Sequence, residues 1–262
     1  MEHNPFQQFM ESFNRELGQI VINKDAVTFI QSAPGDIEKE ADIYRRQPLL
    51  MLYPPLVQKD DFFDTTHRVA GVIKRFFPEQ SRELDLIISA IPEDEQRRTE
   101  LASKMFTPGT NLVACFDRAL PEDILSFLFS HTVKLLMKQY VAKAFPLRDV
   151  EQWRQGACPI CGGMPSFAVL EKDSGKRSLY CGYCEITWPF QRLGCPFCYH
   201  SDSMYIYLEG IKEHRLYVCD NCQGYIKTID LREFEDDDID LNQEDAYTVH
   251  LDLLAVKEGY RK

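Results

Sequence analysis

The chain has 262 residues, of which 44% are hydrophobic and 12% aromatic. This composition can bury the core of one large domain or two ordinary ones, and it excludes wholesale disorder. The formal net charge of -11 excludes the positive electrostatic footprint of a general nucleic-acid-binding protein.

The N-terminal segment lacks the basic start and the apolar run of a signal peptide. The most apolar stretch, Ile124 to Val141, is interrupted by His131, Lys134 and Lys138, so we expect no membrane span. We therefore expect a cytoplasmic protein. In that reducing compartment, the nine cysteines are expected to serve as metal ligands rather than to form disulfides.

Residues 1–150 are predicted to form a helical domain. Apolar residues recur at three- and four-residue spacing from Asp60 to Phe77, and before that at Phe6, Phe9, Met10, Phe13 and Leu17. Short connectors interrupt the helices at residues 32–35, 53–55 and 107–109, where proline occurs in each. Cys115 stands alone among the cysteines and is predicted to be a buried core thiol.

The strongest predicted helix begins at Pro121 and runs to about Phe145. Proline and two acidic residues suit its first turn, and it is apolar on most sides, which is typical of the buried centre of a helical bundle. We predict that His131, on this helix, is a packed core histidine. Pro146 ends the helix, and residues 148–156 are predicted to link two domains.

From Ala157 onwards the helical periodicity gives way to short β-like runs between cysteines, at residues 166–170, 204–208, 215–218 and 225–229. This part contains an internal duplication. Ala157-Cys-Pro-Ile-Cys161 is echoed 37 residues later by Gly194-Cys-Pro-Phe-Cys198, and the segments ending in Cys181 and Cys219 also correspond. We predict one module at residues 151–190 and a second at residues 191–230.

The segment from Asp230 to Asp245 holds nine acidic residues and one basic residue, and we predict a solvated linker there. Residues 246–262 regain an apolar face, which indicates a final helix. Residues 231–262 are therefore expected to be an acidic linker and a C-terminal helix. The predicted fold class is α+β, with an all-α N-terminal domain followed by two tandem rubredoxin-like or zinc-ribbon-like modules and that helix.

Eight cysteines form four Cys-x-x-Cys pairs, each of which, with the turn that it encloses, is here called a knuckle. Two residues between cysteines let the backbone wrap one cation, and two knuckles complete a tetrahedral shell of four sulfurs. We expect each repeat to be self-contained, which gives two metal ions per chain. The predicted ligands are Cys158, Cys161, Cys181 and Cys184 in the first module and Cys195, Cys198, Cys219 and Cys222 in the second.

Alternatives remain open. The first knuckle could instead pair with the third in a cross-braced arrangement, the cysteines could be redox dithiols or disulfides, and His200 or His214 could replace a ligand. Four-sulfur sites take zinc or iron, and spacing alone does not choose between them. The Cys158-Pro-x-Cys-Gly162 form is similar to a rubredoxin knuckle, which favours iron there; the other three knuckles lack that glycine.

With the knuckles in place, the last 105 or so residues resemble the FdhE family, the accessory proteins of formate dehydrogenase. The resemblance includes the residues around Cys158 and Cys181, Glu185 and Trp188, and, further along, Cys219-Asp-x-Cys222, Tyr225-x-Lys227, Leu251-Asp-x-Leu-Ala255 and Glu258-Gly-Tyr260. It departs from the family where Ile186-Thr187 separates Glu185 from Trp188, and in ending soon after Tyr260.

The resemblance implies a cytoplasmic maturation factor with rubredoxin-like metal domains. Such a factor does not oxidise formate but docks to the catalytic subunit of a formate dehydrogenase. Trp188, Phe190 and Phe197, which lie beside the knuckles, are candidates for that contact, and packing between the two modules is the alternative. The sequence agrees, since it contains no Ser-His-Asp arrangement, phosphate-binding glycine loop or HExxH motif, so we expect no enzymatic activity and no catalytic residues. The sequence does not decide whether the chain forms a homo-oligomer.

There are two alternatives to a maturation factor. One is an iron protein that passes single electrons to a partner, and the other is a zinc-ribbon adaptor for nucleic acid or protein. Residues 151–230 hold eight basic and nine acidic residues, which disfavours nucleic acid.

Overall fold

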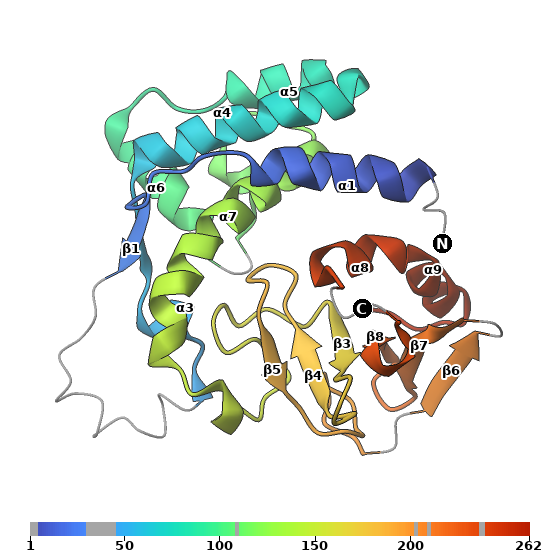
Figure 1. Ribbon diagram of the computed structural model, residues 1–262. Helices are drawn as coiled ribbons and strands as arrows, with labels where there is room; N and C mark the ends of the chain where they lie inside the picture. Colours follow the sequence, from blue (N-terminus) through green and yellow to red (C-terminus); the bar gives the residue numbers. More distant parts are fainter. Residues whose placement is uncertain (1–4, 30–45, 108–109, 202–203, 209–210, 236–238) are drawn as a thin grey trace, which may run out of the picture. The chain divides into compact units, whose positions relative to one another are not determined.

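The structure is a computed structural model that describes residues 5–29, 46–107, 110–201, 204–208, 211–235 and 239–262 (Figure 1). The chain divides into two compact units. The first contains Met1–Pro34 and Leu50–Pro146, and the second contains Gly35–Leu49 and Leu147–Lys262. Among the described residues, no helix combines the length and the apolar character needed to cross a membrane.

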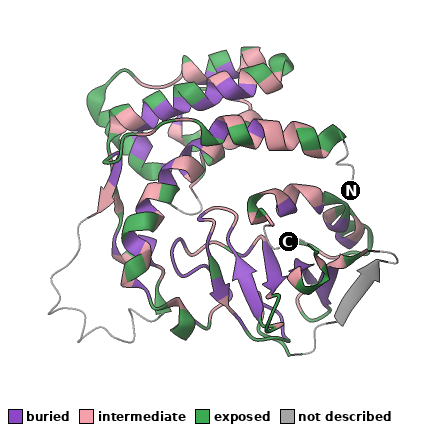
Figure 2. Ribbon diagram, viewed as in Figure 1, coloured by how far each residue is buried: buried purple, intermediate pink, exposed green. Residues whose placement is uncertain are grey.

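The first unit is mainly helical, as predicted. Its helices are α1 (Pro5–Gly18), α3 (Leu49–Leu52, beginning at the boundary between the units), α4 (Lys59–Phe76), α5 (Ser81–Ile88), α6 (Glu95–Lys104) and α7 (Glu122–Ala144). The predicted central helix is α7, which buries residues on several sides (Figure 2). Its Phe129 ring stacks on Phe62 of α4, and Phe13 of α1 contacts Phe127 and His131. Burial lowers the pKa of His131 to about 4, which fits a neutral core histidine.

Two short strands in this unit depart from the all-α prediction. Strands β1 (Val27–Phe29) and β2 (Pro55–Val57) pair antiparallel. The open edge of β1 is satisfied by α7: the Val27 N–H donates to Gln139 Oε1, and Lys143 Nζ donates to the Val27 carbonyl. These partners come from more than 110 residues away, so no local pattern in the sequence predicts the strand.

The second unit is built on one six-stranded sheet. Its strands are β3 (Phe167–Leu170), β4 (Arg177–Tyr180), β5 (Thr187–Pro189), β6 (Met204–Leu208), β7 (Ile211–Cys219) and β8 (Gly224–Asp230), in the order β5-β4-β3-β8-β7-β6. Each predicted module supplies three strands, and the predicted β-like runs fall within β3, β6, β7 and β8. Among the strand pairs of this sheet that the structure describes, only β3 and β8 are parallel, and this pair joins the two modules into a single sheet.

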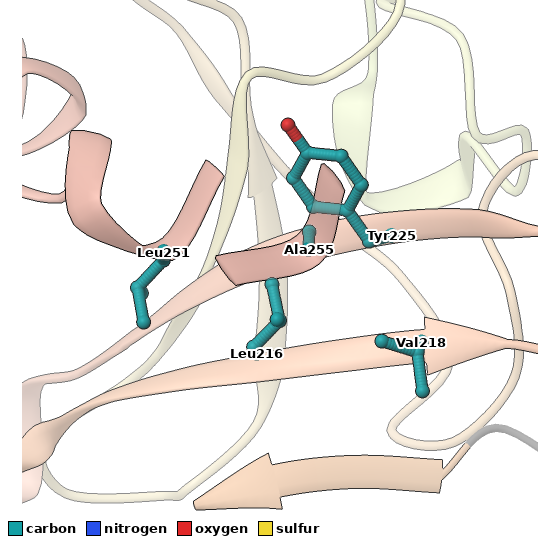
Figure 3. Packing of buried hydrophobic residues seen from close by; sticks show 5 residues of the cluster. All are labelled: Leu216, Val218, Tyr225, Leu251 and Ala255. Carbon is teal, nitrogen blue, oxygen red and sulfur yellow. The ribbon is translucent and has the colours of Figure 1, made fainter. Parts of the chain in front are cut away.

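The C-terminal segment forms two helices, α8 (Leu241–Tyr247) and α9 (Val249–Lys257), where one was predicted. Together they cover part of one face of the sheet. Leu251 and Ala255 of α9 pack against β7 and β8 (Figure 3), in a cluster formed by Leu216, Val218, Tyr225, Leu251 and Ala255. The buried Lys227 reaches from β8 to Asp245 and Asp252 on these helices.

We predicted that the acidic segment from Asp230 to Asp245 is a solvated linker. The structure shows that some of its acids are buried instead. Asp230 is fully buried and pairs with Arg215 and Arg232. Asp240 accepts a hydrogen bond from the Asn242 N–H at the start of α8, and Glu244 is buried against His214. Two of these partners, Arg215 and His214, lie outside the segment, and composition alone does not reveal them. Residues 236–238 lie outside the described part of the chain.

Candidate metal centres

The knuckles share one backbone turn. In the first, the Cys158 N–H donates to the carbonyl of Gly163, and the Gly162 N–H donates back to the Cys158 carbonyl. Cys181 makes the same two bonds with Ile186 and Glu185, and Cys195 makes them with His200 and Tyr199. The residue after each second cysteine has a positive φ: 78° at Gly162, 58° at Glu185, 62° at Tyr199 and 57° at Gln223. All four knuckles therefore adopt the same turn, although only the first has glycine there.

The first group of cysteines comprises Cys158, Cys161, Cys181 and Cys184. The first knuckle precedes β3, and the second connects β4 to β5, so the β3–β4 hairpin brings the two together. The four sulfurs lie within 4.8 Å of one another, and all four residues are buried. Backbone N–H groups of Gly163 and Cys184 donate to Cys161 Sγ and Cys181 Sγ, each at 3.3 Å.

The second group comprises Cys195, Cys198, Cys219 and Cys222, again within 4.8 Å of one another. Its knuckles follow β5 and connect β7 to β8. Cys195 and Cys219 are buried, whereas Cys198 and Cys222 are half-buried. Asn221 Nδ2 donates to Cys198 Sγ at 3.5 Å. The second group is thus more accessible to solvent than the first, and the grouping is sequential rather than cross-braced.

The sulfur geometry fits a tetrahedral metal ion. Measured Sγ···Sγ distances are 3.6 Å for Cys161–Cys181, Cys195–Cys222 and Cys198–Cys219. A regular tetrahedron with metal–sulfur bonds of about 2.3 Å has edges of about 3.8 Å, whereas a disulfide bond is only about 2 Å long. The donor set of four thiols suits zinc or iron.

Burial and close packing shift the pKa values of these thiols in opposite directions. Burial raises the pKa of Cys158 and raises that of Cys195 to about 12, while hydrogen bonds from neighbouring cysteines lower the pKa of Cys181. The Asn221 amide lowers the pKa of Cys198 to about 6. Four adjacent buried sulfurs cannot all ionise without a cation, and a metal ion that binds them displaces their protons.

Other candidates from the sequence lie outside the two groups. Cys115 is half-buried in a short 3-10 turn, not fully buried as predicted, and its Sγ donates to the Asn111 carbonyl at 3.5 Å. His200 is exposed and contributes its backbone carbonyl to Cys195, and His214 pairs with Glu244 at 2.8 Å. Neither histidine replaces a sulfur in the two groups.

A buried arginine that the sequence did not single out lies beside the second group. Arg177 of β4 donates from Nη1 to the carbonyl of Gly194, the residue before Cys195, at 2.8 Å. Burial lowers the pKa of Arg177 to about 10, so its guanidinium remains charged at neutral pH. The only signal in the sequence was the repeat itself, which places an arginine four residues before both Cys181 and Cys219.

Comparisons with known proteins agree with this geometry. The family model described as "FdhE, central domain" matches residues 157–192, which hold the whole first group of cysteines. A protein FdhE homolog from Aquifex aeolicus is 28% identical over 178 residues, covering 65% of this chain and 62% of the relative. Protein FdhE from Salmonella arizonae is 30% identical over 197 residues, covering 73% of this chain and 61% of the relative. The predicted resemblance to the FdhE family is confirmed.

The fold agrees as well. The crystal structure of the FdhE protein from Pseudomonas aeruginosa matches with a TM-score of 0.59 at 19% identity, covering 97% of this chain and 84% of that one. The α+β fold of this chain is therefore similar to that of an FdhE structure. The chain aligns with only about three fifths of the length of the two curated FdhE relatives described above.

Proposed function

We propose that this chain is a cytoplasmic accessory protein that a formate dehydrogenase needs to become active, and that it does not itself oxidise formate. The observation that supports this most is the FdhE resemblance over the first group of cysteines and across the fold. The catalytic subunit of a formate dehydrogenase is the proposed partner. Nucleic acid is not, because the net charge of -11 disfavours it.

Each group of four cysteines is proposed to hold one metal ion, zinc or iron. Cys158, Cys161, Cys181 and Cys184 would hold the first, and Cys195, Cys198, Cys219 and Cys222 the second. The ion would supply cross-linking between each hairpin and its knuckles, with an apparent binding free energy of about 10 kcal/mol or more per site. Backbone N–H groups, such as those of Gly163 and Cys184 in the first group, donate to the sulfurs and fix the turns.

Docking is proposed to involve exposed apolar residues beside the knuckles. Of the three aromatic residues that the sequence made candidates for this contact, Phe197 is half-buried. Trp188 and Phe190 are buried: Trp188 Nε1 donates to the Gln155 carbonyl, and Phe190 packs over Arg177. Leu193 is 62% exposed and Tyr199 53% exposed, and these two residues flank the third knuckle. An exposed leucine and tyrosine beside a rigid metal-bound turn supply apolar and hydrogen-bonding contacts at a small entropic cost.

A redox role is the second candidate, and the uneven exposure of the two groups supports it. If the second group holds iron, its half-buried Cys198 and Cys222 place a four-sulfur centre close to solvent, where a partner can approach. Zinc has no redox chemistry and excludes this role. The metal found in protein purified without air from its native host therefore separates the two candidates.

The test combines co-purification with activity in the native host. A strain lacking the gene is expected to lose formate dehydrogenase activity, and the wild-type chain, tagged, is expected to restore it and to co-purify with the catalytic subunit. Leu193→Ser should weaken this binding about tenfold, equal to about 1.4 kcal/mol, without loss of metal. Leu253→Ser, on the exposed side of α9 (69% exposed), is the matched control. Full activity in the strain lacking the gene, with no co-purification, contradicts the proposal.

A further inference from the structure

Arg177 carries a positive charge in the interior of the second unit. Its side chain is 1% exposed, and its guanidinium carbon lies 5.8 Å from the centre of the Phe190 ring and 5.4 Å from that of Tyr217. Nη1 donates to the Gly194 carbonyl. Nε and Nη2 are buried and have no hydrogen-bond partner among the described residues. Burying an arginine without a negative partner is costly, so a charge that balances it is expected nearby.

The duplication supplies an internal comparison. Arg215 occupies the corresponding position, four residues before Cys219, and it pairs with the fully buried Asp230. Arg177, four residues before Cys181, pairs with no carboxylate in the described part of the chain. The two arginines thus share a place in the repeat but differ in what neutralises them.

Arg177 lines a small hollow in the second unit. Its lining includes Gly194, Cys195, Tyr217 and Cys219, and no acidic side chain is part of it. It has room for about one water molecule, which is too little for an organic anion. Two cysteines of the second group, Cys195 and Cys219, line the same hollow, and they supply negative charge there when they bind a metal ion as thiolates.

We propose that Arg177 is the counter-ion of the second metal centre. Four thiolates around a divalent ion carry a net charge of about -2, and a fixed guanidinium that lines the same hollow as Cys195 and Cys219 stabilises that charge. Arg177 belongs to the hairpin of the first module, so the first module completes the surroundings of the second centre.

The inference rests on the proposed loading of both groups with metal, but not on the formate dehydrogenase partner. The test uses the full chain and Zn²⁺, titrated in competition with a chromophoric chelator. The two binding steps are assigned by their loss in Cys158→Ser and Cys195→Ser. Arg177→Met keeps the length and loses the charge, Arg177→Lys keeps the charge, and Arg177→Gln can still donate to Gly194. Arg192→Gln is the matched control, because Arg192 is exposed and contacts the same Tyr217.

Arg177→Met and Arg177→Gln are expected to weaken Zn²⁺ binding at the second centre about 10- to 100-fold and to leave the first unchanged. Arg177→Lys should recover most of the affinity, and Arg192→Gln should match the wild type. A packing defect in the sheet that both modules share would weaken both centres, so a loss confined to the second centre separates a counter-ion role from packing. Equal weakening of both centres, unchanged affinity at the second centre, or loss of both ions together overturns the proposal. A wild-type chain that binds no Zn²⁺ refutes the metal loading instead.

Discussion

At the scale of single residues, the left-handed position of each knuckle is occupied by glycine once and by a residue with a side chain three times. Residues other than glycine pay about 1–2 kcal/mol to adopt this backbone region. Glu185, Tyr199 and Gln223 nevertheless adopt it, at φ between 57° and 62°. Because the turn aims two sulfurs at one point, the strain at these positions is offset by what the sulfurs bind.

Gly162→Ala is predicted to destabilise the metal-loaded second unit by about 1–2 kcal/mol. A Cβ at Gly162, with φ at +78°, would lie 2.9 Å from Cγ of Pro48, so the cost combines backbone strain with a contact. Gln223→Gly is the control: it relieves strain and loses one bond from Nε2 to the Asp220 carbonyl. It should change stability by less than about 1 kcal/mol. Denaturant unfolding followed by tryptophan fluorescence measures both, and equal losses would contradict the strain argument.

The eight cysteines could be chosen from the sequence because their spacing is local and repeated. Arg177 could not be chosen, because its importance comes from its burial without a carboxylate partner among the described residues. The sequence does not show which charges lie near one another in the fold. The sequence also does not show which residues pack around Trp188 and Phe190, so it made them candidates for an exposed docking contact although they are buried. Their burial depends on Gln155 and Arg177, which lie at other points of the chain.

At the scale of elements, the sequence predicted most strands of the second unit but not their order. The β3–β8 pair joins residues about 60 apart, and a parallel pairing between two similar modules leaves no mark in local alternation. The same limit applies to β1 and β2. Helix α7 was predicted accurately because its apolar residues run for 23 positions without interruption by proline or glycine.

Lys227 is the element-scale link between β8 and the C-terminal helices. Its Nζ lies 2.7 Å from Asp245 Oδ1 and 2.8 Å from Asp252 Oδ2, and its side chain is 1% exposed. Lys227→Met is predicted to destabilise the second unit by about 2–3 kcal/mol. This lies below the 3–5 kcal/mol typical of a fully buried pair, because Asp245 and Asp252 are partly exposed.

Hydrogen exchange in α8 and α9 should increase in Lys227→Met. Lys262→Met is the control, since Lys262 lies 3.9 Å from Asp252 but is 35% exposed, and it should cost less than about 1 kcal/mol. Adding Asp252→Asn to Lys227→Met should recover part of the loss by removing the carboxylate left without its partner. An effect of Lys227→Met no larger than that of Lys262→Met would show that the helices are held by the Leu251 cluster alone.

At the scale of the whole molecule, the two units differ in what stabilises them. The first is built around aromatic and aliphatic side chains of α1, α4 and α7. The second encloses two groups of four cysteines within 65 residues, from Cys158 to Cys222, whose aliphatic content is low. A short segment of that composition gains stability from metal that its apolar contacts do not supply.

Removal of metal with a strong chelator is therefore predicted to unfold the second unit and to leave the helices of the first. Both tryptophans, Trp153 and Trp188, lie in the second unit, so their fluorescence reports that unit alone, while far-ultraviolet circular dichroism reports mainly helices. The ion of the second group should leave first, because Cys198 and Cys222 are half-buried whereas all four cysteines of the first group are buried. Release of two ions in two phases, with a tryptophan change and most helical signal retained, is the expected result. Loss of helical signal in step with tryptophan fluorescence would mean that the units unfold as one, and release of both ions with neither signal changing would mean that the metal does not stabilise the fold.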